Sequence, residues 1–137
     1  MPINKQRTKI EMREDGPFQQ EGFELMAAVF AVHNEIGGGL AEEVYQESLE
    51  IELALQNIPF IAKRPLTTFY KGQALKRCYV PDFCVHDGII VELKAVSQLL
   101  PEHEAQLFNY MRLTDKRVGC LINLAPLKRA EWRRYVL

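Results

Sequence analysis

Residues 79–95 read YVPDFCVHDGIIVELKA, and this stretch decides the fold. Its second half is an apolar run that only Glu92 and Lys94 interrupt, which is typical of a strand buried on both faces. Asp87-Gly88 is a strong turn signal. We therefore expect the strand that follows Asp82 to fold back against the strand that contains Glu92, as an antiparallel hairpin.

Three charged side chains interrupt this apolar hairpin. Residues two apart in a strand point to the same face, so Glu92 and Lys94 emerge together while Val91 and Leu93 fill the other face. The hairpin brings Asp82 beside them. A solvated Glu92–Lys94 ion pair at a sheet edge would explain the charges without a function. Burying two uncompensated carboxylates is costly, however, and this favours an oxygen cage for a hard divalent cation.

The composition indicates one globular domain. The chain has 137 residues, enough for a substantial core, and its 47% hydrophobic and 26% charged residues are ordinary values for a folded protein. Residues 1–17 are polar and lack the apolar core of a signal peptide, so we expect a flexible arm followed by one domain over residues 18–137. No apolar run is long enough to span a membrane, and we expect a cytoplasmic protein.

The charge balance argues against a strongly basic nucleic-acid binder, because the formal net charge is -1. Basic residues nevertheless cluster locally, at Lys63-Arg64, Lys76-Arg77, Lys116-Arg117, Lys128-Arg129 and Arg133-Arg134. The three cysteines are odd in number and have no C-x-x-C spacing, so neither a disulfide framework nor a thiolate zinc site is indicated. We expect Cys78, Cys84 and Cys120 to be small core or strand residues.

A helix is expected from about Phe18 to the glycines at 37–39, which end it. Its apolar residues recur at helical spacing in two stripes, which predicts burial around most of its circumference. One stripe contains Phe23, Met26, Ala27, Phe30 and His33, and the other contains Leu25, Val29, Val32 and Ile36.

The second helix, about residues 40–56, carries most of its glutamates on a solvated face. Glu42 lies in the first turn, where the helix dipole favours a carboxylate, and Tyr45 points toward the core one turn later. Glu42 is either a helix-start residue or a third carboxylate aimed at the site beside Asp82 and Glu92.

The rest of the chain predicts strands and one more helix. The prolines of residues 58–70 indicate an extended edge segment, and residues 73–83 read as a strand that leads into the central hairpin. A helix over residues 101–113 separates the hairpin from an apolar strand at 118–124, which predicts a right-handed parallel crossover. The tail, about residues 128–137, fits either an edge strand or a short helix. This order of elements is α+β.

Four further polar side chains could belong to the site. Gln106 and Tyr110 are four residues apart on the third helix and reach in the same direction. Taken alone, they would be a surface glutamine and a half-buried tyrosine. His86 and Asp87, in the loop between Asp82 and Glu92, could each supply an incidental extra ligand.

This ordered set of motifs resembles the PD-(D/E)xK nuclease superfamily. Pro81-Asp82 and Glu92-Leu93-Lys94 match its signature. Gly39-Leu40-Ala41-Glu42-Glu43-Val44-Tyr45 resembles the motif of its small GxxExxY family. Further similar segments are Val32-His33-Asn34-Glu35, Pro101-Glu102-His103-Glu104-Ala105-Gln106 and Leu121-Ile122-Asn123, so that the resemblance covers about residues 23–124.

The resemblance implies a restriction-endonuclease-like core of α/β/α type, with a mixed four-stranded sheet flanked by helices. It implies that Asp82 and Glu92 hold Mg²⁺ or Mn²⁺, that Glu42 completes or orients the metal shell, and that Lys94 positions or activates the attacking water. Mg²⁺ needs only a couple of protein carboxylates, which suits this set. Tyr45, Gln106 and Tyr110 would support the site or contact the nucleic-acid backbone.

The expected function is therefore metal-dependent hydrolysis of phosphodiester bonds, in DNA. The alternative is a catalytically inactive module that keeps the nuclease fold and binds nucleic acid or another protein. One site cuts one strand, so a homodimer with a twofold axis would address both strands.

Overall fold

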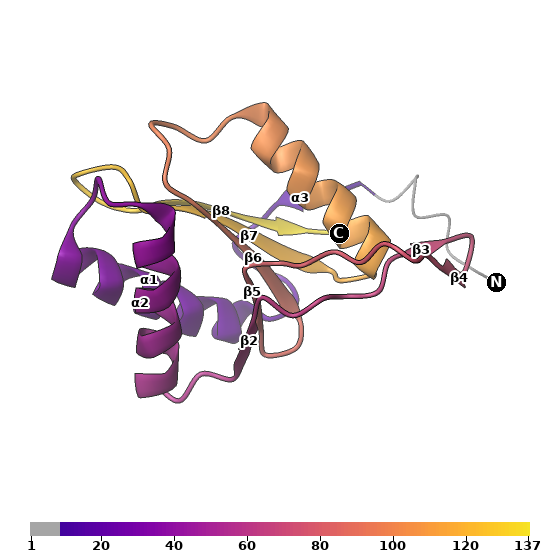
Figure 1. The fold of residues 1–137 in the computed structure, drawn as a ribbon, viewed down its shortest axis with the longest axis horizontal. Helices are drawn as coiled ribbons and strands as arrows, with labels where there is room; N and C mark the ends of the chain where they lie inside the picture. The colour runs from indigo at the N-terminus through magenta and orange to yellow at the C-terminus, as the bar shows by residue number, and fades with distance from the viewer. Residues whose placement is uncertain (1–8) are drawn as a thin grey trace.

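The computed structural model describes residues 9–137 and shows a mixed six-stranded sheet with helices on both faces (Figure 1). The strand order is β1-β8-β7-β6-β5-β2, and β3 and β4 form a separate two-stranded ribbon. The strands are β1 (Glu11–Met12), β2 (Phe60–Ala62), β3 (Phe69–Tyr70), β4 (Gln73–Ala74), β5 (Phe83–Val85), β6 (Ile89–Lys94), β7 (Val118–Asn123) and β8 (Glu131–Val136). The helices are α1 (Gln19–Ile36), α2 (Glu42–Leu55) and α3 (Pro101–Thr114).

Each face of the sheet has its own core. Val91 and Leu93 of β6 pack in the cluster beneath α1 and α2, whereas Ile90 packs in the cluster beneath α3 (Figure 1). Because strand residues alternate between faces, Glu92 and Lys94 lie on the face of α3. The predicted layers and the mixed sheet are confirmed, and the sheet has six strands where four were expected. Strand β6 is central, so the reading of Glu92 and Lys94 as charges at a sheet edge is wrong.

The central hairpin of β5 and β6 forms as predicted, but the left-handed residues of its turn are His86 and Asp87, with φ of 52° and 55°. The Gly88 N–H donates to the Val85 carbonyl over 3.1 Å, which closes the turn. Gly88 is required for a different reason, since a Cβ at this position would lie 2.1 Å from the Phe18 ring. The first helix is thus packed directly against the tip of the hairpin.

The crossover from β6 through α3 to β7 is parallel, as predicted. Helix α3 begins at Pro101, and the His103 side chain satisfies the backbone of the preceding residue, because the Leu100 N–H donates to His103 Nδ1 over 3.0 Å. The helix packs closely on β7 because Gly119 has no side chain. A Cβ there would lie 2.7 Å from Met111 Sδ.

The tail forms a strand, β8, and β1 pairs with its outer edge. A flexible arm was expected over residues 1–17, of which residues 1–8 lie outside the described residues. Residues 9–17 are tied to the sheet, because the buried Arg134 donates to the carbonyls of Arg13 and Asp15 over 3.3 and 3.0 Å and also to that of Pro17.

The prediction that α1 is buried around most of its circumference is wrong. Phe23 is 64% exposed and Phe30 is 40% exposed. Helix α1 lies in an outer layer, so only one side of it meets the sheet and α2 (Figure 1). His33, from the same expected stripe, is buried, and its Nε2 lies 2.7 Å from the Pro126 carbonyl oxygen.

The extended edge segment predicted over residues 58–70 is confirmed for β2 alone, and the strand predicted over residues 73–83 is largely wrong. Only β2, at the edge of the sheet, and β5 belong to the sheet, and residues 63–82 leave it as a ribbon that projects past α3 (Figure 1). Cys78 lies exposed in this excursion and is neither a core nor a strand residue. Cys84 and Cys120 are buried in β5 and β7, as expected. Among the described residues, no helix has the length and apolar character needed to cross a membrane.

Candidate active site

Asp82 and Glu92 face each other across the central hairpin. Phe83 pairs with Val91 in the β5–β6 register, so Asp82, which directly precedes β5, lies opposite Glu92. Asp82 is only 6% exposed. Its Oδ2 accepts a hydrogen bond of 2.7 Å from the Leu93 N–H, so the carboxylate is fixed by the backbone of the neighbouring strand.

Lys63 completes the surroundings of Asp82. Its ammonium forms an ion pair with Asp82 Oδ1, and its backbone N–H donates to the Asp82 carbonyl over 3.2 Å. Gln46 Nε2 donates to the same carbonyl over 3.2 Å. Lys63 follows the end of β2 with a φ of 54°, a left-handed conformation that a lysine seldom adopts. Such a conformation at a charged contact is often part of a functional site.

Attraction to the carboxylates controls the protonation of Lys63. Burial lowers the pKa of Lys63, but the hydrogen bond and attraction to Asp82, together with the attraction to Glu92 and Glu42, outweigh burial and raise it. The ammonium therefore stays charged and neutralises Asp82.

Glu92 is the second carboxylate of the hairpin, and burial dominates its electrostatics. The Tyr79 hydroxyl donates to Glu92 Oε1. Burial raises the pKa of Glu92 to about 7, against the opposing attraction of Lys94 and Lys63 and a hydrogen bond from the Asp82 backbone. Glu92 is therefore close to half-protonated at neutral pH.

Glu42 supplies the third carboxylate, from the first turn of α2. Burial and then repulsion by Asp82 raise the pKa of Glu42, whereas Lys94 and Lys63 lower it. These mutual effects show that the structure brings together the four predicted residues, Glu42, Asp82, Glu92 and Lys94. The role of Glu42 as a third carboxylate of the site stays a prediction.

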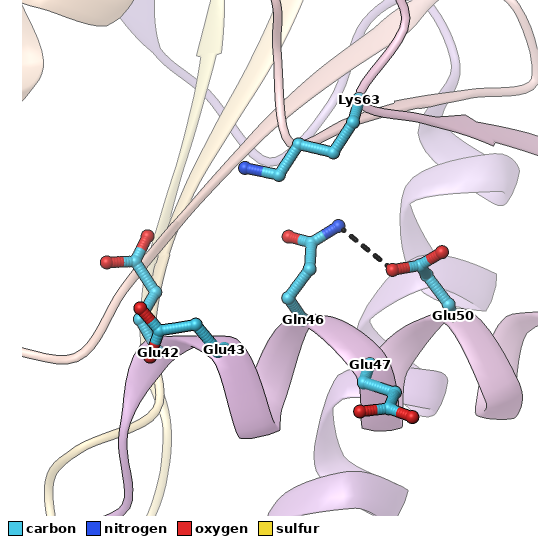
Figure 2. A pocket seen from close by; sticks show the side chains of 6 residues that line it. All are labelled: Glu42, Glu43, Gln46, Glu47, Glu50 and Lys63. Carbon is cyan, nitrogen blue, oxygen red and sulfur yellow. Dashed lines mark hydrogen bonds between the residues drawn. The ribbon is translucent and has the colours of Figure 1, made fainter.

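A hollow of about 430 Å³ opens beside Asp82, between α2 and Lys63 (Figure 2). It is lined by Glu42, Glu43, Gln46, Glu47, Glu50 and Lys63. Figure 2 shows the Lys63 side chain reaching across from the opposite wall toward the row of α2 side chains. Apart from Lys63 and Gln46, these groups are carboxylates, so this wall repels anions.

The structure places the three supporting residues in different environments. The Tyr45 hydroxyl donates to the Gly37 carbonyl over 2.8 Å and accepts from the Leu40 N–H over 3.1 Å, so Tyr45 holds the loop that precedes α2. Gln106 Nε2 donates to the Tyr110 hydroxyl over 2.9 Å.

Tyr79 connects α3 to the site. Its ring stacks on the Tyr110 ring with centroids 3.5 Å apart, and its hydroxyl contacts Glu92. Gln106 and Tyr110 thus reach the carboxylates through Tyr79.

His86 and Asp87 lie away from the carboxylates, at the turn of the hairpin. His86 Nε2 lies 2.8 Å from Glu24 Oε2, and Asp87 Oδ1 lies 3.6 Å from Lys116 Nζ. Their contacts give no support to a role as extra ligands.

Sequence reasoning missed two residues of the site, Lys63 and Tyr79. Lys63 stood out only as half of a basic pair, and nothing local links it to Asp82, nineteen positions away. Tyr79 lies inside the deciding stretch, and its position three residues before Asp82 was the signal that could have drawn attention to it.

A mixed sheet between helices, with carboxylates and a lysine where a central hairpin meets α2, defines the restriction-endonuclease-like class of folds. The chain belongs to the PD-(D/E)XK nuclease superfamily, whose family model matches residues 19–135. It is also similar to a solved structure described as "Crystal structure of SSO0001", with a TM-score of 0.50 and 22% identity. That likeness concerns the fold and covers 85% of this chain but only 58% of the other. Among curated proteins, no sequence matches this chain.

Divalent metal ions are general cofactors of this superfamily, and the residues present fit one. Carboxylate oxygens are the ligands that Mg²⁺ prefers, and Asp82, Glu92 and Glu42 supply them. The raised pKa values of Glu92 and Glu42 reflect burial and mutual repulsion, which a cation would relieve. Within residues 9–137, no three acidic, histidine or cysteine side chains converge closely enough to form a ready cage. Metal binding would therefore require side chains to move, beginning with Lys63.

Proposed function

We propose that this protein is a nuclease that hydrolyses phosphodiester bonds in DNA with the help of Mg²⁺ or Mn²⁺. The observation that carries the proposal is the placement of two acidic residues, Asp82 and Glu92, opposite each other in the central hairpin, with Lys94 two residues further on the same face of β6. Membership of the superfamily supports a nuclease, and the oxygen-rich donor set supports the metal.

Each residue has a role in this proposal. A bound divalent ion would polarise the scissile phosphate and lower the pKa of the attacking water. Asp82 and Glu92 would hold it, and Glu42 would complete or orient its shell. Lys94 would position the water, whose oxygen forms the new bond to phosphorus and whose proton passes to solvent. The bond from phosphorus to the leaving oxygen breaks, and that oxygen keeps the electron pair. Asp82 is held in place for this task by the Leu93 N–H.

Two finer proposals concern family and assembly. We place the chain in the GxxExxY family, because Tyr45 of the motif holds the loop at Gly37 and thereby fixes the start of α2, where Glu42 lies. We further propose a homodimer, since two sites related by a twofold axis would cut both strands of a duplex.

The second candidate function is a catalytically inactive module that binds nucleic acid or protein. One observation favours it: Lys63 already neutralises Asp82, so the carboxylate is satisfied without a metal ion.

Cleavage of labelled DNA by the wild type and by Asp82→Asn and Lys94→Ala variants tests the nuclease proposal. We expect wild-type cleavage in Mg²⁺ or Mn²⁺, none in EDTA, and a loss of roughly a hundredfold or more in each variant, since these groups act in the transition state. Cleavage by the variants at the wild-type rate would overturn the proposal.

Calorimetric titration with Mn²⁺ separates the two candidates. The nuclease should bind Mn²⁺ in a way that the Glu92→Gln substitution abolishes, because an amide is a weaker ligand than a carboxylate. Absence of any Glu92-dependent binding would favour the inactive module.

A further inference from the structure

Residues 64–81, here called the basic arm, leave the sheet beside Asp82 and return to it there. The Lys63 N–H donates to the Asp82 carbonyl over 3.2 Å and closes the base of the arm. Leu66 and Tyr79 pair further out through hydrogen bonds of 2.6 and 3.0 Å, and β3 pairs with β4 near the tip. The arm is therefore a two-stranded ribbon, paired at intervals, that starts at the site and projects past α3 (Figure 1).

Tyr79 fixes the arm to Glu92 and to helix α3. It is buried, its hydroxyl contacts Glu92, and its ring stacks on Tyr110 of α3. The orientation of the ribbon is thus set by the same residues that surround the candidate metal ligands.

The charge of the arm differs from that of the rest of the chain. It contains four cations, Arg64, Lys71, Lys76 and Arg77, and no aspartate or glutamate. The whole chain has a formal charge of -1, so the remainder carries -5 against the +4 of the arm. All four cations are exposed, and none of them takes part in the ion pairs found within residues 9–137.

The tip of the arm also exposes aromatic rings. Tyr70 is 62% exposed and Phe69 is 41% exposed, and Lys71 Nζ lies 5.5 Å from the centre of the Tyr70 ring. Exposed aromatic rings among cations are typical of surfaces that bind nucleic acid, where bases stack on the rings.

Helix α2 makes the opposite wall unsuitable for a polyanion. It contains five glutamates and no cation, and four of these glutamates line the hollow next to Lys63 (Figure 2). A nucleic acid at Asp82 and Glu92 would be repelled on that side and attracted along the arm.

We propose that the basic arm binds the phosphodiester backbone of DNA next to the scissile phosphate. The inference rests on the proposed function and adds the path of the substrate. Lys71 lies eight positions after Lys63, so the ribbon reaches at most roughly 26 Å from the site at the rise of an extended strand. Phosphates follow one another about every 3.4 Å along each strand, so the arm contacts several nucleotides on one side of the cut.

The test is the salt dependence of DNA binding, measured in EDTA so that cleavage does not interfere. Fluorescence anisotropy with a labelled duplex and with its single strand gives the dissociation constant over a series of NaCl concentrations. The arm variant is Lys71→Asn/Lys76→Gln, where asparagine suits the φ of 49° at position 71. The charge-matched control is Lys128→Gln/Arg129→Gln, an exposed pair in the loop between β7 and β8.

We expect the arm variant to bind DNA several-fold more weakly and to lower the slope of log K against log[salt]. The decrease should approach about 1.8 on the duplex or about 1.4 on the single strand, for two lost phosphate contacts. The control should keep the wild-type slope, and both variants should keep the wild-type melting temperature. An unchanged slope in the arm variant, an equal decrease in the control, or no binding of wild type to either DNA would overturn the inference.

Cleavage assays of the same proteins keep this inference separate from the proposed function. If the wild type cleaves DNA but the arm variant keeps the wild-type salt slope, the inference about the arm is overturned and the proposed nuclease activity stands. If the wild type cleaves no DNA but the arm variant binds DNA more weakly with a lower slope, the nuclease proposal is overturned and the inference about the arm stands.

Discussion

Asp82 and Glu92 both carry carboxyl groups, but the partners that surround the two groups differ. Asp82 is paired with the Lys63 ammonium and accepts the Leu93 N–H. Glu92 has a tyrosine hydroxyl as its hydrogen-bond partner, and burial raises its pKa to about 7. Carboxyl groups in such different environments can take different roles in one site.

The raised pKa of Glu92 predicts a pH dependence of folding stability. Below the unfolded value of 4.5 both states bind the proton, and Glu92 costs nothing. As the pH rises from 4.5 to about 7, the unfolded state releases the proton and the folded state keeps it, so the folded protein loses stability. The loss reaches roughly 3 kcal/mol above pH 7.

Urea unfolding in EDTA across this pH range measures the effect in the wild type and in Glu92→Gln. The amide does not titrate, so the difference between the two curves isolates Glu92. The variant should gain stability relative to the wild type as the pH rises from 4.5 to 7. Parallel curves would show that burial does not raise the pKa of Glu92.

Lys63→Met should tighten Mn²⁺ binding, because it removes a positive charge from Asp82 Oδ1. We expect an increase in affinity of roughly tenfold, which equals about 1.4 kcal/mol. The metal-free variant should also be less stable than the wild type, by about 1–3 kcal/mol, since one oxygen of a buried carboxylate loses its partner.

Calorimetry gives the Mn²⁺ affinity and urea unfolding gives the stability of this variant. Arg64→Met, which removes the neighbouring exposed cation, is the matched control and should change neither quantity much. Weaker Mn²⁺ binding by Lys63→Met would mean that Lys63 helps to build the metal site and does not compete for it.

At the scale of elements, the loop between α1 and α2 is held against the loop that follows β7. A Cβ at Gly38 would lie 2.4 Å from the Pro126 carbonyl oxygen and 2.6 Å from that of Ala125. These are backbone atoms that cannot turn away. The Gly39 N–H also donates to the Ala125 carbonyl over 2.9 Å. This contact sets where α2, and therefore Glu42, begins.

Gly38→Ala should destabilise the protein by about 2–3 kcal/mol and reduce nuclease activity, because the loop must move and displace Glu42. Gly22→Ala is the control, since the nearest atom to its new Cβ would be Arg134 Nε at 3.6 Å and the glycine lies within α1. It should leave both quantities near the wild-type level or raise the stability. Thermal unfolding and DNA cleavage check both variants, and a wild-type-like Gly38→Ala would contradict the proposed role of the contact.

The elements that could be predicted from the sequence are those with local signals. The turn at Asp87-Gly88 and the apolar run of β6 predicted the hairpin, and the helix between β6 and β7 predicted the parallel crossover. The basic arm could not be predicted, because its apolar and polar residues alternate no more clearly than those of an edge strand. The arm lies outside the sheet because no strand of the sheet pairs with it, and the sequence does not show this. The exposed faces of Phe23 and Phe30 were missed for a related reason, since spacing shows a stripe but not what covers it.

The site followed the same rule. Glu92 and Lys94 could be placed on one face by the period of a strand, and Asp82 opposite them by the turn. The first turn of the second helix made Glu42 a candidate third carboxylate, and the resemblance of the motifs favoured that role over a helix-start residue. Lys63 could not be found, because its ion pair with Asp82 depends on how β2 ends at the edge of the sheet and not on spacing.

Across the whole molecule, charge is divided between two sides of one site. The acidic wall of α2 and the +4 of the basic arm meet at Asp82, and among the described residues that line the hollow Lys63 is the only cation. A formal net charge of -1 conceals this division, so whole-chain charge gave too simple an argument against nucleic-acid binding. The distribution of charge decides where a polyanion can lie.

The N-terminal segment is joined to β8 by a buried cation as well as by backbone pairing. Arg134 of β8 donates to the carbonyls of Arg13, Asp15 and Pro17, and β1 pairs with the outer edge of β8. We predict that Arg134→Met releases residues 9–17 and destabilises the protein by about 2–4 kcal/mol, because several charge-assisted hydrogen bonds are lost together.

Hydrogen exchange followed by mass spectrometry checks this prediction, since it locates the loss of protection. In Arg134→Met the N-terminal segment and β8 should exchange faster, whereas the β5–β6 hairpin should change only by the global loss of stability. Arg129→Met, which removes an exposed arginine from the preceding loop, should leave the pattern unchanged. DNA cleavage should survive in Arg134→Met below its melting temperature, because Arg134 contacts none of the site carboxylates; slower exchange or a loss confined to the hairpin would contradict the assigned role.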